Sequence, residues 1–146
     1  MPAPRVFADE QAKWRDLVGG FILAFGDIEL VSHKLWNRYY PDTEPPVNFK
    51  ERTGKLLWHA RQDARVKAPA IDALESSLRL ADRRNTIAHN PMQVQVYQHS
   101  TLGSLVLQLA ISSPASDQFI TDEALQALRS EVEEVASTLY ANIEFS

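Results

Sequence analysis

Apolar residues recur at every third or fourth position near the start of the chain, which predicts one long amphipathic helix. The pattern extends from Asp9 to Tyr40. Its apolar members are Trp14, Val18, Phe21, Phe25, Ile28, Leu35 and Tyr39. Pro41 ends this helix because proline lacks the amide hydrogen that a helix needs.

A second helix is predicted after a loop. The loop is the segment PDTEPPV, whose prolines favour irregular backbone. Asn48 is followed three residues later by Glu51, a spacing that resembles a capping box. We therefore expect a helix from this point to about Gln62.

The third predicted helix begins near Pro69 and ends before Pro91, which disfavours helical geometry at the residue preceding it. One seam of this helix is apolar and consists of Ile71, Leu74, Leu78 and Ala81. The last turn contains His89.

The hydrophobic period then changes from helical to alternating. QVQVYQ, the turn HSTLGS and LVLQLAI together predict a β-hairpin. Thr121, followed by two acidic residues, starts a final helix. Its apolar face is Leu125, Leu128, Val132, Val135, Leu139 and Ile143.

These elements predict a mainly α fold in a single domain, residues 1–146. We expect a four-helix bundle with a β-hairpin appended between the third and last helices, in which the first and last helices are the longest.

Composition narrows the functional classes. A chain with 45% hydrophobic and 23% charged residues is expected to fold. The absence of cysteine excludes disulfides, thiolate zinc sites and a cysteine nucleophile. The first residues lack the apolar run of a signal peptide, and the longest apolar stretch, residues 17–26, is about half of a membrane span. We therefore expect a cytoplasmic protein that does not bind membranes.

Charge is unevenly distributed. The net charge of −4 disfavours a general polyanion binder, but residues 50–84 hold nine basic against five acidic residues. Residues 117–146 hold one basic against seven acidic residues. The basic stretch is either a solvated charge run or a local patch for phosphate.

The third helix has an amide in its predicted seam. The seam continues from Ala81 through Asn85, and burying an unpaired amide costs about 1–3 kcal/mol. Asn85 thus needs a partner, for which Glu29 and Ser32 on the first helix are candidates, or a wet groove. At 100° per residue, His89 lies about 40° from Asn85 and Arg84 about 100° to the other side. In the alternative interpretation, Asn85 and His89 are satisfied structural residues.

The string RRNTIAHN resembles the signature of the HEPN superfamily, in which Arg, commonly followed by Asn, precedes His by four to six intervening residues. Here the motif is Arg84, Asn85 and His89 at the end of the third helix. FGDIE in the first helix, with Glu29 facing inward, also resembles these proteins.

The resemblance implies a homodimer whose two motifs form one composite, metal-independent ribonuclease site with RNA as substrate and no cofactor. One His89 would deprotonate the RNA 2′-hydroxyl, and its mate would protonate the leaving 5′-oxygen. Arg84 would bind the phosphate, and Asn85 would orient His89 or the phosphate. Glu29 and Ser32 would support them.

The resemblance also suggests a toxin–antitoxin or defence system with an antitoxin protein as partner. Some of these toxins carry a modified tyrosine two residues after the histidine, but this chain has Pro91 there, which argues against that route of regulation. Two alternatives stay open. One is a non-catalytic HEPN-like module for dimerisation or for binding nucleotide or RNA, and the other is a purely structural helical protein.

Other candidate residues favour packing over chemistry. His33, His59 and His99 lack the spacing of a metal site. Trp14, Trp36 and Trp58 fall at helix-packing positions, so we expect them in the core.

Overall fold

The computed structural model describes residues 5–89, 92–98, 105–112 and 119–145. Its helices are α1 (Arg5–Tyr39), α2 (Phe49–Ala60), α3 (Ala68–His89) and α4 (Asp122–Asn142). Its strands are β1 (Met92–Gln98), β2 (Leu105–Ser112) and β3 (Phe119–Thr121). The prediction of a mainly helical fold with a hairpin between the third and last helices is confirmed.

Two helices begin where the capping pattern predicted. The Asn48 side chain accepts a hydrogen bond from the Glu51 amide at 3.0 Å, and the Thr121 hydroxyl accepts one from the Ala124 amide at 3.2 Å. The prediction that the last helix would be second in length is wrong. α3 has 22 residues and α4 has 21, because α3 continues without a helix breaker to His89.

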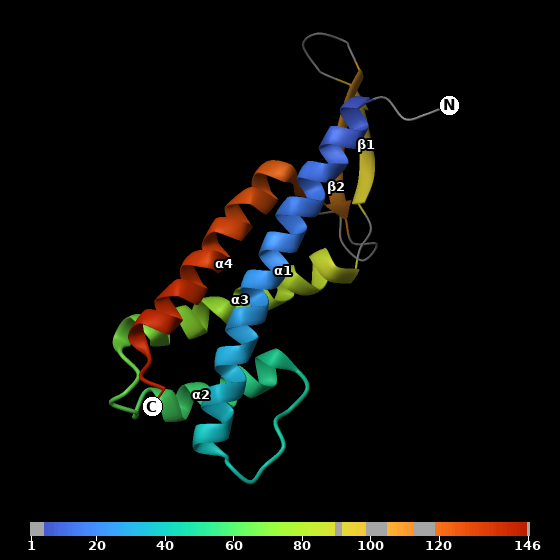
Figure 1. The fold of residues 1–146 in the computed structure, drawn as a ribbon. Coiled ribbons are helices and arrows are strands. Elements are labelled where there is room, and N and C mark those ends of the chain that lie inside the picture. The colour runs from blue at the N-terminus through green and yellow to red at the C-terminus, as the bar shows by residue number, and fades with distance from the viewer. Residues whose placement is uncertain (1–4, 90–91, 99–104, 113–118, 146) are drawn as a thin grey trace.

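The other three helices pack around α1. Figure 1 shows α4 running beside α1 along much of its length, while α3 crosses behind α1 and also packs against α4. The shorter α2 packs against the C-terminal part of α1 and against α3. This arrangement brings the end of α3, the start of α2 and the middle of α1 into one region.

The core lies between these helices and is formed mainly by large apolar side chains. Those fully buried include Trp14, Phe21, Phe25, Ile28, Leu35, Leu56, Leu74, Leu80, Leu125 and Leu139. Burial of Trp14 and Trp36 confirms their prediction as core residues. The same prediction is wrong for Trp58, which is 63% exposed, because Leu56, Leu57 and Ala60 take the inward positions of α2.

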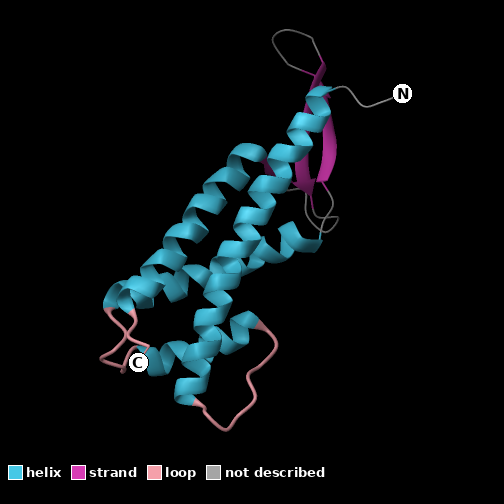
Figure 2. Ribbon diagram, viewed as in Figure 1, coloured by secondary structure: helices cyan, strands magenta, loops and turns pink. Residues whose placement is uncertain are grey.

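The strands form a small antiparallel sheet in the order β1-β2-β3 (Figure 2). The β1–β2 register runs from Met92 opposite Ile111 to Gln98 opposite Leu105. The hairpin's connecting residues, 99–104, lie outside the described part of the chain. β3, which the alternation pattern did not predict, pairs with β2 and leads directly into α4. Buried Ile111 and Ile120 join this sheet to the helical core.

The loop between α1 and α2 is fixed at two points and forms one wall of the candidate site (Figure 2). The Trp36 indole donates to the Thr43 carbonyl at 2.8 Å. The Arg52 side chain donates from Nη1 to the Pro46 carbonyl, also at 2.8 Å. The loop is thus tied to both helices that it connects. In the described ranges, no helix has the length and apolar character needed to cross a membrane.

Candidate functional site

The end of α3 carries the three residues of the predicted motif. Asn85 and His89 are exposed, while Arg84 is partly buried. Arg84 donates from Nη1 to the side-chain oxygen of Asn85 at 3.3 Å. Asn85 and His89 are four positions apart in a helix, so they lie on neighbouring positions of one face. His89 is the last residue of α3.

Asn85 is exposed and lines a groove, which is one of the two outcomes that the sequence left open, but it does not continue the buried seam. The buried stripe of α3 consists of Ala70, Ala73, Leu74, Ser77, Leu80, Ala81 and Ile87. At 100° per residue, Asn85 lies about 80° from the middle of this stripe, at Ser77, whereas Arg84 lies only about 20° from it. The apolar seam predicted from the sequence therefore lies along one edge of the buried stripe. Arg84, not Asn85, is the polar residue that continues the buried stripe toward the end of α3.

Glu29 contacts Arg84 instead of Asn85. Glu29 Oε1 lies 3.9 Å from Arg84 Nε, and both side chains are about one-third exposed. The long Arg84 side chain reaches from α3 across to α1, which the shorter Asn85 does not. An ion pair with this distance and exposure contributes little to stability.

Ser32 is fully buried and pairs with a residue that the sequence analysis did not single out. Its hydroxyl donates to the Glu29 carbonyl at 2.6 Å and accepts from Arg52 Nε at 2.9 Å. Neither of the two predicted partners, Glu29 and Ser32, therefore binds Asn85.

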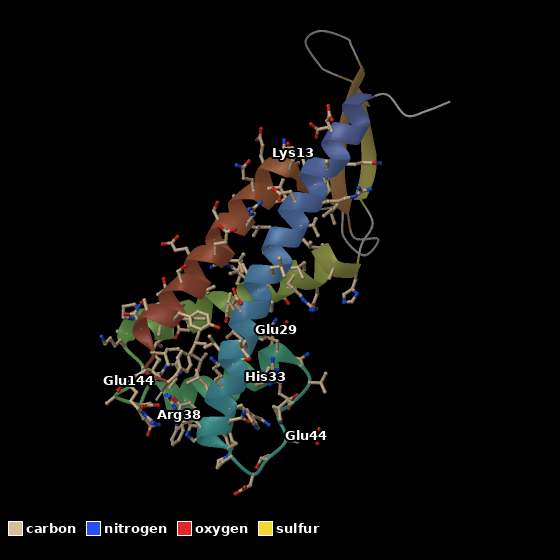
Figure 3. The ribbon with its side chains drawn as sticks, viewed as in Figure 1. Lys13, Glu29, His33, Arg38, Glu44 and Glu144 are labelled. Carbon is tan, nitrogen blue, oxygen red and sulfur yellow. The ribbon has the colours of Figure 1, made fainter. Side chains whose placement is uncertain are left out.

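A groove of about 560 Å³ lies between α1, the 41–48 loop, the start of α2 and the end of α3. It is lined by Phe25, Glu29, His33, Glu44, Pro45, Pro46, Val47, Asn48, Phe49, Lys50, Arg52, Ala81, Arg84 and Asn85. Figure 3 shows Glu29 and His33 on the flank of α1 nearest to the loop that carries Glu44. The groove is lined by Arg84, Asn85 and Glu29. His89 lies one turn further along α3 and does not line it.

Arg52 is the residue that sequence reasoning missed. It is only 2% exposed, and its guanidinium contacts Ser32, two loop carbonyls and the Phe49 ring. Burial lowers its pKa, and the nearby Glu29 carboxylate opposes that effect. One signal was available in the sequence: Arg52 precedes Leu56 by four residues, so both lie on the inward face of α2.

His33 and His59 have different surroundings. Burial, followed by the charge of Arg52, lowers the pKa of His33, and the Glu29 carboxylate opposes this shift. His59 shares a 2.8 Å hydrogen bond with the Tyr40 hydroxyl and stacks on Tyr39, which fits the packing role predicted for it. His99 lies outside the described residues. Among the residues that are described, no three His, Asp or Glu side chains gather as a metal site would require.

Carboxylates form ion pairs with several basic side chains of the stretch at residues 50–84. Lys50 pairs with Asp82, Arg61 with Glu75, Arg65 with Asp63, and Arg79 with Glu131. Three of these four carboxylates belong to the stretch itself, so the ion pairs engage individual basic side chains but do not cancel its net positive charge. Arg52, in contrast, forms no ion pair within the described ranges.

Comparison of the chain with protein-family models, with curated proteins and with solved structures finds no match.

Proposed function

We propose that this protein is a metal-independent endoribonuclease of the HEPN type, acting as a homodimer with Arg84, Asn85 and His89 at a composite site. One observation carries the proposal: Asn85 and His89 are exposed on one face at the end of α3, with Arg84 in contact with Asn85. An exposed His89 at a helix end is free of the core and accessible both to a strand of RNA and to a second copy of the chain.

The chemistry fits these residue types. The RNA 2′-oxygen attacks the adjacent phosphorus, a 2′-O–P bond forms and the bond to the 5′-oxygen breaks. One neutral His89 accepts the 2′-hydroxyl proton, and the partner's His89, as imidazolium, donates a proton to the leaving 5′-oxygen. The Arg84 guanidinium stabilises the charge on the phosphorane, and Asn85 orients Arg84. The products are a 2′,3′-cyclic phosphate and a 5′-hydroxyl. In a toxin–antitoxin system, an antitoxin protein that covers this end of α3 would inhibit the reaction.

The Glu29–Arg84 contact favours a second candidate, a non-catalytic HEPN-like module that binds RNA or nucleotide. Glu29 already neutralises part of the Arg84 charge, and His89 does not line the groove that contains Arg84. The contact is nevertheless weak, at 3.9 Å and partly exposed, so a phosphate that accepts two hydrogen bonds from Arg84 can replace it.

Cleavage of single-stranded RNA in EDTA tests the first candidate. The parent protein should release 2′,3′-cyclic phosphate ends and leave DNA intact, because DNA lacks the 2′-hydroxyl. His89→Ala should reduce the rate by at least about 100-fold, since general acid–base catalysis contributes about 10²–10⁴-fold. Arg84→Lys should also lose activity, because an ammonium group cannot form the bidentate contact of a guanidinium.

Matched variants on the same helix serve as controls. Asp72→Ala changes an exposed residue near the start of α3, and Arg79→Lys repeats the arginine change at a site that pairs only with Glu131. Both should cleave like the parent. An inactive parent that still binds RNA would favour the non-catalytic module. Equal activity of the parent and His89→Ala would show that His89 takes no part in catalysis.

A further inference from the structure

Arg52 is a buried cation without a partner of opposite charge. Its Nε donates to Ser32 and its Nη1 to the Pro46 carbonyl at 2.8 Å and to Val47 at 3.5 Å, so all its hydrogen-bond acceptors are neutral. Nη2 has no acceptor within the described part of the chain. A charged group removed from water is costly unless an opposite charge and further hydrogen bonds compensate for it.

The groove that Arg52 lines offers an anion additional contacts. Arg84 and Lys50 also line it. Lys50 pairs with Asp82 and Arg84 weakly with Glu29, so Arg52 is the cation of the groove that no described ion pair neutralises.

Phe49 and Lys50, in the first turn of α2, also line the groove, and amides at a helix start have no helix carbonyl to bind. The next amide, that of Glu51, is already capped by Asn48. This helix start adjoins the buried guanidinium of Arg52 and its unused donor.

The aromatic side chains of the groove fix the position of this guanidinium. Phe49 packs on Phe25 with ring centroids 5.0 Å apart, and the guanidinium carbon of Arg52 lies 5.5 Å from the Phe49 ring centre. Together with Ser32 and the loop carbonyls, these contacts hold the guanidinium in one orientation before any ligand arrives. A preorganised donor loses less entropy on binding than a free side chain does.

We propose that the groove is a phosphate site, with the Arg52 guanidinium at its inner end and Lys50 and Arg84 at its rim. The bound phosphate accepts hydrogen bonds from Arg52 Nη2 and from Arg84, and it displaces Glu29 from Arg84. This site does not depend on cleavage by His89, which lies outside the groove. A free nucleotide or a nucleic-acid strand can supply the phosphate.

Calorimetric titration at low salt tests the proposal with three probes. These are inorganic phosphate, AMP and a short 2′-O-methyl oligouridylate that has hydroxyl ends and cannot be cleaved. At least one should bind the parent protein. Tighter binding of AMP identifies a free nucleotide as the source, and tighter binding of the oligonucleotide identifies a strand. An absence of binding by all three probes, to the parent and to Glu29→Gln alike, would overturn the proposal.

The decisive variant is Glu29→Gln, which removes the competing carboxylate, and its charge near Arg52, while it leaves every hydrogen bond of Arg52 in place. It should bind the successful probe several-fold more tightly than the parent. Asp27→Asn, an exposed site on the same helix and outside the groove, makes the same change in net charge and is the control. Equal effects of the two variants would show a general electrostatic response and contradict a specific site.

Arg52→Lys should weaken binding by about tenfold or more, because a charge-assisted hydrogen bond contributes about 1.5–3 kcal/mol. Arg61→Lys, at the exposed end of α2, is its control and should bind like the parent. If Arg52→Lys fails to fold, the comparison of Glu29→Gln with Asp27→Asn still decides the question. If Arg52→Lys folds and binds the probe as tightly as the parent, Arg52 only holds the 41–48 loop and does not bind the phosphate.

Discussion

Asp63, between α2 and α3, shows at the scale of one residue how a carboxylate joins distant segments. Its side chain is 8% exposed and accepts hydrogen bonds from the Tyr39 hydroxyl at 2.7 Å and from Arg65 Nε at 3.0 Å. Arg38 also contacts it at 3.3 Å and donates to the carbonyl of Glu144. Burial raises the pKa of Asp63, but the hydrogen bonds from Arg65 and Tyr39 outweigh burial and hold it well below its usual value. The end of α1, the loop after α2 and the C-terminal residues thus meet at one anion.

This depressed pKa predicts a pH-dependent contribution to folding. Because the folded state binds the Asp63 proton less tightly than the unfolded state, the stabilisation is complete above the unfolded pKa of about 4. It decreases as the pH falls from there toward the folded pKa. Asp63→Asn should therefore lower the free energy of unfolding by roughly 2 kcal/mol at pH 7.

Urea unfolding at several pH values measures this difference. The gap between parent and Asp63→Asn should narrow below about pH 4, because the unfolded parent binds a proton at Asp63 there while the folded parent resists it. Asp72→Asn, at an exposed carboxylate of α3, is the control and should differ little from the parent at any pH. A gap that stays constant down to pH 2 would show that Asp63 contributes through packing instead of charge.

Within the candidate site, the residue scale also explains the misplacement of Asn85. Both Asn85 and Arg84 are polar, so residue type alone does not tell which of them lies at the edge of the buried face of α3. The structure separates them because Arg84 is long enough to reach Glu29 on α1, while Asn85 stays at the surface.

At the scale of the elements, two of the three glycines in α1 have different surroundings. A Cβ at Gly26, which is exposed, would meet no atom within 4 Å, whereas a Cβ at Gly20 would lie 2.6 Å from Arg129 Nε. Arg129, from α4, also pairs with Asp16 and Glu133. Gly20 thus leaves room for the Arg129 side chain against α1.

Gly26→Ala should raise the free energy of unfolding by about 0.5–1 kcal/mol, because alanine loses less backbone entropy than glycine in a helix. Gly20→Ala should gain less, since the new methyl group forces Arg129 to move from its present position. Denaturant unfolding of both variants gives the comparison. Equal gains would mean that Arg129 shifts without loss of its ion pairs.

At the scale of the whole molecule, the composite-site proposal requires two chains in one active particle. Light scattering should give the mass of a dimer at micromolar concentration. Mixing the parent with an equal amount of His89→Ala under subunit exchange should lower nuclease activity per parent chain. If both histidines are needed, only the parent homodimers, about one quarter of the total, remain active.

If each chain instead cleaves RNA independently, the mixture should keep about half of the nuclease activity of the parent alone at the same total protein concentration. Mixing with Asp72→Ala is the control and should cause no loss. A monomeric parent that cleaves RNA, or a mixture at half activity, would contradict the two-histidine mechanism while leaving Arg84 and Asn85 available for substrate binding.

The sequence predicted most of the fold because local rules decide most of it. Helical period, proline stops and the caps Asn48 and Thr121 depend on residues a few positions apart, so the helices and the hairpin were predictable. β3 was not, since three residues are too few to show an alternating period and it forms only by pairing with β2.

For the candidate site too, local sequence rules determined some features and the packing of the helices decided the others. The sequence by itself determined which residues carry the motif and that they lie at the end of the third helix. Only the tertiary structure decided that Asn85 faces solvent, that Glu29 meets Arg84, and that Arg52 lies buried against Ser32 and lines a groove. The physical reason is that these contacts join α1, α2, α3 and a loop. Their geometry depends on how the helices cross, which no pattern within a single helix contains.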